Sequence, residues 1–200
     1  MKEYHTFTRR PVLQALCRAL IRLLGWRIDA PFPKETKYVL IFAHHTSNWD
    51  LVIGLLAALS VGFWPQWIAK DSLFRWPFGG IMRWFGGLPV DRSKSNNFVD
   101  QIVEQFKQRD NLVIAITPEG TRSKTDYWKT GFYYIALNAG VPIVTSYLDY
   151  KRKVGGIGPL FWPTGEIEAD LVGIREFYAG VTAKKPGLQG EVRVRPGRKQ

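Results

Sequence analysis

The chain has 200 residues, 46% of them hydrophobic, which is enough for a single domain with a sizeable core and excludes a largely disordered protein. Its one cysteine, Cys17, excludes a disulfide framework and a metal site built on several thiolates. The 28 lysines and arginines against 17 acidic residues give a net charge of +11, which indicates an anionic partner: a nucleic acid, an acidic membrane surface, or an acidic substrate or carrier.

Eight tryptophans favour a membrane surface among these partners, because indole rings prefer the headgroup region of a bilayer. Stacking on a single-stranded nucleic acid would use the same aromatic and basic residues, so composition leaves both open. The first residues lack the order of basic, apolar and small-residue segments that a secretory signal has. We therefore expect a reducing compartment and no secretory leader.

The segment from Pro11 to Trp26 has the apolar periodicity of an amphipathic helix, surrounded by arginines. This pattern fits a helix that covers the core, a basic helix that lies in the interface of an anionic bilayer, or both. The central arginines exclude a membrane-spanning helix here. We treat residues 1–27 as an N-terminal amphipathic helical segment. The apolar positions are Leu13, Leu16, Leu20, Leu23 and Leu24.

The next part of the chain reads as a strand, a polar turn and a helix. Residues 28–37 form a connector, 38–42 a buried strand, 43–50 the turn and 51–60 a buried helix. A turn over 62–65 and a strand over 66–69 follow. The uncharged run 51–69 is long enough to span a bilayer, but Gly62, Pro65 and Gln66 interrupt it, so we reject a spanning helix.

The remaining elements alternate between helices and strands. Residues 69–85 interleave aromatic side chains with arginines and fit a short helix on the core, a membrane-facing rim or an acyl-chain pocket. The alternation predicts an α/β fold, one domain over 28–190 with a central, mostly buried mixed β-sheet flanked by helices, followed by a mobile basic tail at 191–200. Strands are expected within 86–92 and at 112–116, 141–147 and 165–168, helices at 95–109 and 130–139, and a loop at 155–159.

Two of the three histidines, His44 and His45, lie in the polar turn, with Asp50 five residues after His45. His45 and Asp50 can meet only if His45 lies in the turn and Asp50 in the first turn of the helix. A carboxylate on one ring nitrogen leaves the other nitrogen as a base. A metal site using His44, His45 and Asp50, or a purely structural cap, would use the same residues.

The chain offers this base no nucleophile of its own. There is no Gly-x-Ser-x-Gly elbow, and Cys17 lies in the N-terminal helix without a neighbouring histidine. A base without a nucleophile is suited to activating a hydroxyl of the substrate, or a water molecule, directly.

A second polar turn follows the strand at 112–116. Glu119, Gly120, Thr121, Arg122 and Ser123 bring backbone amides, hydroxyls and a guanidinium to a strand end, the groups that grip a phosphate. Arg92, Lys70 and Lys129 are candidates to join them, although each basic residue alone would also suit a solvated surface.

These motifs resemble those of the lysophospholipid (1-acylglycerol-3-phosphate) acyltransferases, the glycerolipid acyltransferase superfamily. The sequence from His45 to Asp50 matches that family's His-four-residues-Asp catalytic motif. Residues 87–92 look like its second block, 118–123 are nearly identical to its third, and 141–144 resemble its fourth. Departures occur at His44, Thr117 and Thr145, where many members have Asn, Phe and Pro.

The resemblance implies an acyltransferase mechanism. His45, oriented by Asp50, would take a proton from an acceptor hydroxyl, which attacks an acyl thioester of coenzyme A or of acyl carrier protein. Arg92 and the Glu119–Ser123 turn would hold the acceptor's phosphate, with Lys70 and Lys129 nearby. No bound cofactor or metal is implied. The expected partners are a membrane lipid acceptor, the acyl donor and an anionic membrane, on whose cytoplasmic face the protein would lie peripherally.

Two other functions remain as alternatives. A thioester or lipid hydrolase would use the same His-Asp pair with water in place of the acceptor. A basic nucleic-acid-binding module would bind oligonucleotides in a salt-sensitive way and would not need His45.

Overall fold

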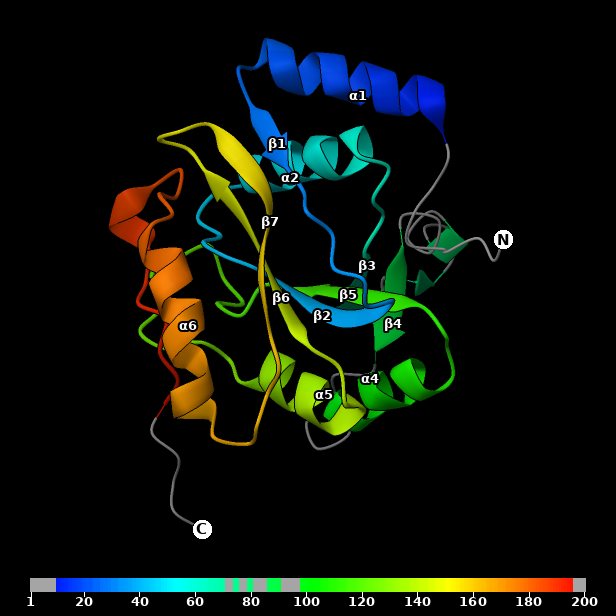
Figure 1. Cartoon of the computed structure of the whole chain (residues 1–200), viewed down its shortest axis with the longest axis vertical. Coiled ribbons are helices and arrows are strands. Elements are labelled where there is room, and N and C mark those ends of the chain that lie inside the picture. Colours follow the sequence, from blue (N-terminus) through cyan, green and yellow to red (C-terminus); the bar gives the residue numbers. More distant parts are fainter. Residues whose placement is uncertain (1–9, 71–73, 76–78, 81–85, 91–97, 196–200) are drawn as a thin grey trace.

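The central sheet has seven strands in the part of the chain that the structure describes, in the order β1-β7-β6-β2-β5-β3-β4 (Figure 1). The structure is a computed structural model, and it describes residues 10–70, 74–75, 79–80, 86–90 and 98–195. The strands are β1 (Arg27–Asp29), β2 (Lys37–Phe42), β3 (Gln66–Lys70), β4 (Gly87–Val90), β5 (Leu112–Ile116), β6 (Ile143–Asp149) and β7 (Val154–Phe161).

Strand β2 lies in the middle of a parallel set. It pairs in parallel with β5 on one side and β6 on the other, and β3 continues the parallel set to β4. Only β7 runs against its neighbour β6, and it pairs in parallel with β1. The carboxyl ends of β2, β5 and β6 therefore lie at one edge of the sheet, the usual position of ligand sites in α/β folds.

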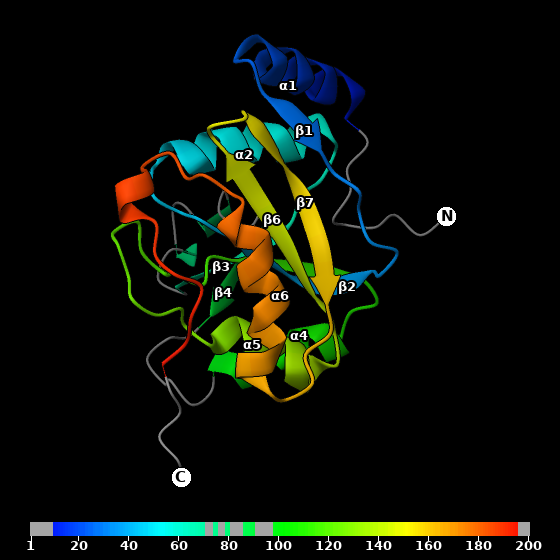
Figure 2. The ribbon, with the colours of Figure 1, turned by 60° about the vertical axis from the view of Figure 1, so that its left-hand side comes forward.

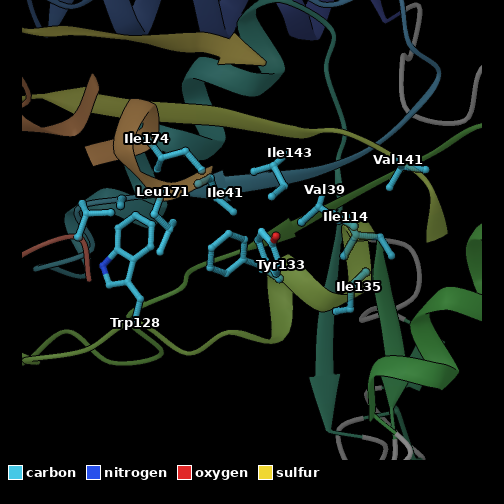
Figure 3. Close-up of a cluster of buried hydrophobic side chains, with 14 of the residues drawn as sticks. Val39, Ile41, Ile114, Trp128, Tyr133, Ile135, Val141, Ile143, Leu171 and Ile174 are labelled. Atoms are coloured by element: carbon cyan, nitrogen blue, oxygen red, sulfur yellow. The ribbon is translucent and has the colours of Figure 1, made fainter. Parts of the chain in front are cut away.

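The alternating side chains of β2 form two cores, one on each face of the sheet. Val39 and Ile41 belong to the larger core, with side chains of α4 (Phe98–Lys107), α5 (Gly131–Ala139) and α6 (Ile167–Ala179) (Figure 3). Tyr38 and Leu40 face the other way, with residues at the end of α2 (Trp49–Ser60). Because both faces are buried, β2 reads in the sequence as a continuous apolar run.

The N-terminal helix α1 (Pro11–Leu23) packs against α2 at one end of the molecule, away from α4 and α5 (Figures 1 and 2). Its buried line consists of Cys17 and Ile21. Of the five leucines in the predicted apolar stripe, Leu13 is partly buried and the other four are exposed, among them Leu16 at 58% and Leu23 at 84%. Covering the core thus occupies only a narrow part of this helix, and most of the leucines of its apolar face are exposed.

Most of the predicted elements are confirmed to within two or three residues, including the strands at 38–42 and 112–116 and the helix at 130–139. The rejected spanning helix is also absent at 51–69, because α2 ends at Ser60 and a turn leads into β3. Within the ranges that the structure describes, no helix has both the length and the hydropathy needed to cross a bilayer. Most of the aromatic segment at 69–85 lies outside those ranges.

Three secondary-structure predictions are wrong: two in the second half of the chain, and the connector before the strand at 38–42. The expected loop at 155–159 is the middle of β7. The expected strand at 165–168 consists of two residues before the unpredicted helix α6 and the first two residues of that helix. Strand β1 lies where a connector was expected. In β7 the glycines indicate close packing and not a turn: a Cβ on Gly156 would lie 1.6 Å from the Asp29 carbonyl oxygen.

The expectation of a mobile tail from residue 191 is wrong for the residues up to 195, and residues 196–200 lie outside the described ranges. Val192 and Val194 are buried in the larger core, and Val194 forms a β-bridge with Trp128. The chain up to these residues is therefore part of the α/β domain. The division of the chain at residue 27 stays a prediction.

Candidate active site

The polar turn at 43–48 crosses the carboxyl edge of the sheet, between the end of β2 and the start of α2. The loop that follows β5 and the residue that follows β6, Tyr150, reach the same edge because the three strands are parallel. Three segments distant in sequence thus meet around His45.

His45 and Asp50 form the predicted pair. Asp50 lies in the first turn of α2, and its Oδ2 is 3.1 Å from Nδ1 of His45. The Asp50 side chain is fully buried, whereas that of His45 is 21% exposed. Since an ionised carboxylate can only accept, Nδ1–H donates this hydrogen bond, and the lone pair of His45 lies on Nε2. The pair therefore presents a base at an accessible ring nitrogen.

The Asp50 carboxylate accepts three more hydrogen bonds. The backbone amides of Thr46 and Ser47 donate to Oδ2 over 2.9 and 2.8 Å, and the Tyr150 hydroxyl donates to Oδ1 over 2.7 Å. Burial by itself would raise the pKa of Asp50, but the donors from His45, Tyr150, Ser47 and Thr46 together lower it below its ordinary value. Asp50 thus stays ionised and also ties down the start of α2, as expected of an acidic residue in a first helical turn.

Glu119 lies on the inner side of this turn and not on a surface open to substrate. It is 4% exposed. Its Oε2 accepts a 2.6 Å hydrogen bond from the His45 backbone amide, and its Oε1 is 3.2 Å from Nδ1 of His44. His44 is also buried, in edge contact with Tyr178. The carboxylate of Glu119 therefore holds the histidine turn in place.

The rest of the loop after β5 is exposed beside the turn. Gly120 has a positive φ of 63°, and a Cβ there would lie 2.7 Å from Nζ of Lys129, so the lysine side chain passes directly over it. Arg122 donates a hydrogen bond to the Asn48 side chain, which ties the loop to the turn. Thr121 and Ser123 are exposed, and the Ser123 amide donates to the Thr121 hydroxyl.

The structure does not describe the side chains of two predicted site residues, Arg92 and Lys70. Arg92 lies outside the described residues. Lys70 ends β3, which is parallel to β5, so its backbone lies at the same edge of the sheet, but only that backbone is described.

A cavity of about 690 Å³ lies on the other side of the turn. Its walls come from α6 and residues 186–193, and it is lined by His44, Arg175, Tyr178, Gln189 and Arg193 among others. The two histidines therefore face different surroundings: His45 is paired with Asp50 from α2, and His44 borders this cavity.

The arrangement does not favour the metal alternative. His44 is paired with Glu119 and His45 with Asp50. Over the described ranges, no group of three or more His, Cys, Asp or Glu side chains is placed to hold a metal ion. What the geometry supplies is a histidine base whose ring nitrogen and backbone are each held by a different carboxylate.

The family model described as Acyltransferase matches residues 27–149, more than half of the chain. The chain belongs to the acyltransferase family. The match includes the histidine turn and the loop after β5, ends one residue before Tyr150 and leaves α1 outside. The resemblance found in the motifs is therefore confirmed.

Curated relatives of this acyltransferase-family chain are named as 1-acyl-sn-glycerol-3-phosphate acyltransferases. The 1-acyl-sn-glycerol-3-phosphate acyltransferase of Haemophilus influenzae is 31% identical over 137 residues, which are 62% of this chain and 55% of that protein. The enzyme of the same name from Escherichia coli is 32% identical over 135 residues, 62% and 54% of the two chains. The chain spans about half the length of the curated relatives it matches.

A solved structure has the same fold. The crystal structure of the 1-acyl-sn-glycerophosphate (LPA) acyltransferase, PlsC, from Thermotoga maritima matches with a TM-score of 0.56 over 86% of this chain and 80% of that one. The identity is 17%, so this likeness establishes the architecture: a mostly parallel mixed sheet flanked by helices.

Tyr150 is the residue of this site that sequence reasoning missed. It lies 100 positions from Asp50 and directly after an apolar strand, in a position where an aromatic residue is ordinarily read as part of the core. No spacing rule links it to the histidine turn. A signal would have come only from knowing that β6 is the parallel neighbour of β2.

Proposed function

We propose that this protein transfers an acyl group from an acyl thioester to a free hydroxyl of a lysophospholipid, such as 1-acylglycerol-3-phosphate. The observation that carries this proposal is the 3.1 Å His45–Asp50 pair in a chain of the acyltransferase family. Within the described residues, the His45 ring bonds no side chain except Asp50, so no serine or cysteine stands ready as a nucleophile. The names of the curated relatives support this choice of acceptor.

In the proposed reaction His45 acts as the general base. Its Nε2 takes the proton from the acceptor hydroxyl while the oxygen forms a bond to the thioester carbonyl carbon. When the carbon–sulfur bond breaks, the imidazolium returns the proton to the leaving thiolate. Base assistance of this kind is worth about 10²–10⁴-fold in rate, and positioning of the two substrates contributes more.

The acceptor's phosphate would be held by the exposed loop after β5. The amides and hydroxyls of Thr121 and Ser123, with Arg122 and Lys129, are the donors, and Arg92 and Lys70 belong to the same proposal. Gly120 lets the Lys129 side chain lie close to the loop backbone. For Glu119 we propose a different role from phosphate binding, because a buried carboxylate on the His45 amide is suited to holding the turn and would repel a phosphate.

The acyl donor would be coenzyme A or acyl carrier protein, both of which carry negative charge that suits a chain of net charge +11. For the lipid acceptor we propose a peripheral position on an anionic membrane. Exposed leucines of α1, with Arg22 in its last turn, offer apolar and basic surface. At the start of α2, Trp49 and Leu51, the sequence neighbours of Asp50, are also exposed.

The test is a comparison of two reactions of the purified protein with a radiolabelled acyl thioester, one with 1-acylglycerol-3-phosphate and one without. The expected result is a doubly acylated lipid that carries the label, and slow release of free fatty acid when the acceptor is omitted. Release of fatty acid at the full rate without acceptor would identify a hydrolase and overturn the proposal.

A further inference from the structure

The two oxygens of Asp50 have different partners. Oδ2 accepts from the His45 ring and from the amides of Thr46 and Ser47, all within the same turn. Oδ1 accepts a hydrogen bond from the hydroxyl of Tyr150, the residue that follows the carboxyl end of β6. Within the described residues no other group bonds Oδ1.

We propose that Tyr150 is a positioning residue for acyl transfer, which fixes the Asp50 carboxylate and through it the ring of His45. This inference rests on the function proposed above. It adds to the His-Asp pair a third side chain that lies outside the region matched by the family.

The Tyr150 ring is held from several directions. Trp26, just after α1, packs edge-on against it with ring centroids 4.9 Å apart. The ammonium of Lys184 lies 5.2 Å from its centroid and 5.6 Å from that of Trp49. The Tyr150 backbone amide donates to the Thr182 carbonyl over 2.9 Å. These contacts leave the ring little freedom, and they hold its hydroxyl in hydrogen-bonding distance of Asp50.

The protonation states support a donor role. Burial and the hydrogen bond to Asp50 raise the pKa of Tyr150 above its ordinary value, so it keeps its proton at any pH at which an enzyme works. Without the hydroxyl, Oδ1 would stay buried with no partner. An unsatisfied buried carboxylate is costly, so it would turn away from His45 or take up a proton, and either change weakens its hold on the imidazole.

The experiment compares Tyr150→Phe with the wild-type protein and with the control Tyr38→Phe. The Tyr38 hydroxyl is also buried but has no hydrogen-bond partner among the described residues, so its removal should leave catalysis unchanged. For Tyr150→Phe we expect kcat to fall about tenfold, as for loss of one hydrogen bond to a charged group, with KM nearly unchanged. The acid limb of the pH–rate profile should move to lower pH, because a carboxylate that holds the imidazole less firmly stabilises the imidazolium less.

A second measurement does not depend on activity. In carbon-13 NMR titrations of the side-chain carboxyls, the pKa of Asp50 should be low in the wild-type protein and should rise in Tyr150→Phe. A merely structural tyrosine would lower the thermal midpoint without moving either the acid limb or this titration. Unchanged kcat together with an unchanged Asp50 titration would overturn the inference.

The two proposals fail in different ways. If the wild-type protein transfers no acyl group, the proposed function is wrong, and the Asp50 titration still decides whether Tyr150 controls that carboxylate. If Tyr150→Phe does not fold, the wild-type titration decides alone: an Asp50 that titrates at the ordinary value for aspartate would contradict the role given to Tyr150.

Discussion

The side chain of His45 makes one hydrogen bond within the described residues, to Asp50, and is partly exposed. Its removal should therefore cost little stability and nearly all of the activity. For His45→Ala we expect kcat to fall by at least about 10²-fold, the lower end of what a general base contributes, with a thermal midpoint close to that of the wild-type protein. Steady-state assays and a thermal melt check both values. Substantial activity in this variant would mean that another group takes the proton.

Besides the catalytic role proposed for it, Asp50 should contribute to stability, and this contribution depends on pH. Its folded-state pKa is lowered, so its stabilisation is fully present above the unfolded-state pKa of about 3.9 and is lost as the pH falls through the folded-state value. Asp50→Asn should therefore be less stable than the wild-type protein by about 1–3 kcal/mol at pH 7, because an amide cannot replace a carboxylate that accepts from four donors.

Urea unfolding of Asp50→Asn and the wild-type protein at pH 7, 5 and 3.5 measures this difference. The gap in free energy of unfolding should shrink as the pH falls below about 4, where the wild-type carboxyl begins to take up its proton in the unfolded state. A gap that stays constant over this range would indicate that the ionised form of Asp50 is not what stabilises the turn.

The contact between His45 and Asp50 was predictable because both residues lie within one turn, where spacing restricts geometry. The position of Glu119 on the inner side of the turn was not predictable. The sequence places Glu119 among hydroxyls and an arginine, which favours a phosphate loop, but the residue reaches inward to a backbone amide 74 positions away. Tyr150 is a similar case. Contacts over such distances depend on strand order, which a single sequence does not specify.

At the scale of the elements, alanine substitutions at one glycine of β7 and at one of α2 should change the stability in opposite directions. A Cβ on Gly158 would lie 2.3 Å from the Phe177 ring and 2.4 Å from the Thr145 hydroxyl, so Gly158→Ala should destabilise the protein by about 1–3 kcal/mol through overpacking. Gly54 in α2 is the matched control. Nothing lies within 4 Å of its Cβ position, and Gly54→Ala should stabilise the helix by about 1 kcal/mol.

Thermal or urea unfolding of the two alanine variants tests this pair. Opposite signs are expected, since the same chemical change fills space that is occupied at one position and free at the other. If Gly158→Ala were as stable as the wild-type protein, α6 would not pack on β7 as closely as the structure has it.

The same glycines explain why part of the fold could not be predicted. Gly155, Gly156, Gly158 and Pro159 form a pattern that is typical of loops. In this fold the three glycines have another cause: β1, β6 and α6 approach the strand too closely for a side chain at these positions. The strands at 38–42 and 112–116 were predictable because both faces of each are buried, so the sequence is apolar throughout. Helix α6 did carry a signal, since Leu171, Ile174 and Tyr178 lie on one helical face and acidic residues begin it.

For the molecule as a whole, the exposed leucines of α1 and the exposed residues of α2 lie on two helices that pack together. The basic side chains on α1 and the net charge of +11 complement an anionic bilayer. The proposed active site lies at the start of α2, so a lipid acceptor held by this surface would be close to His45. Apolar burial and charge attraction would then act together in membrane binding.

Leu16→Glu/Leu20→Glu tests this surface, because these leucines are 58% and 49% exposed and their replacement should not disturb the core. Each lost leucine removes about 1 kcal/mol of apolar transfer, and each glutamate adds repulsion from anionic lipid, so partition into anionic liposomes should weaken more than about tenfold. Val172→Glu is the matched control, because Val172 is similarly exposed, at 45%, but lies on α6. In flotation assays the control should float like the wild-type protein while the double variant stays in the dense fraction. If all three floated equally, α1 would not be the surface that meets the membrane.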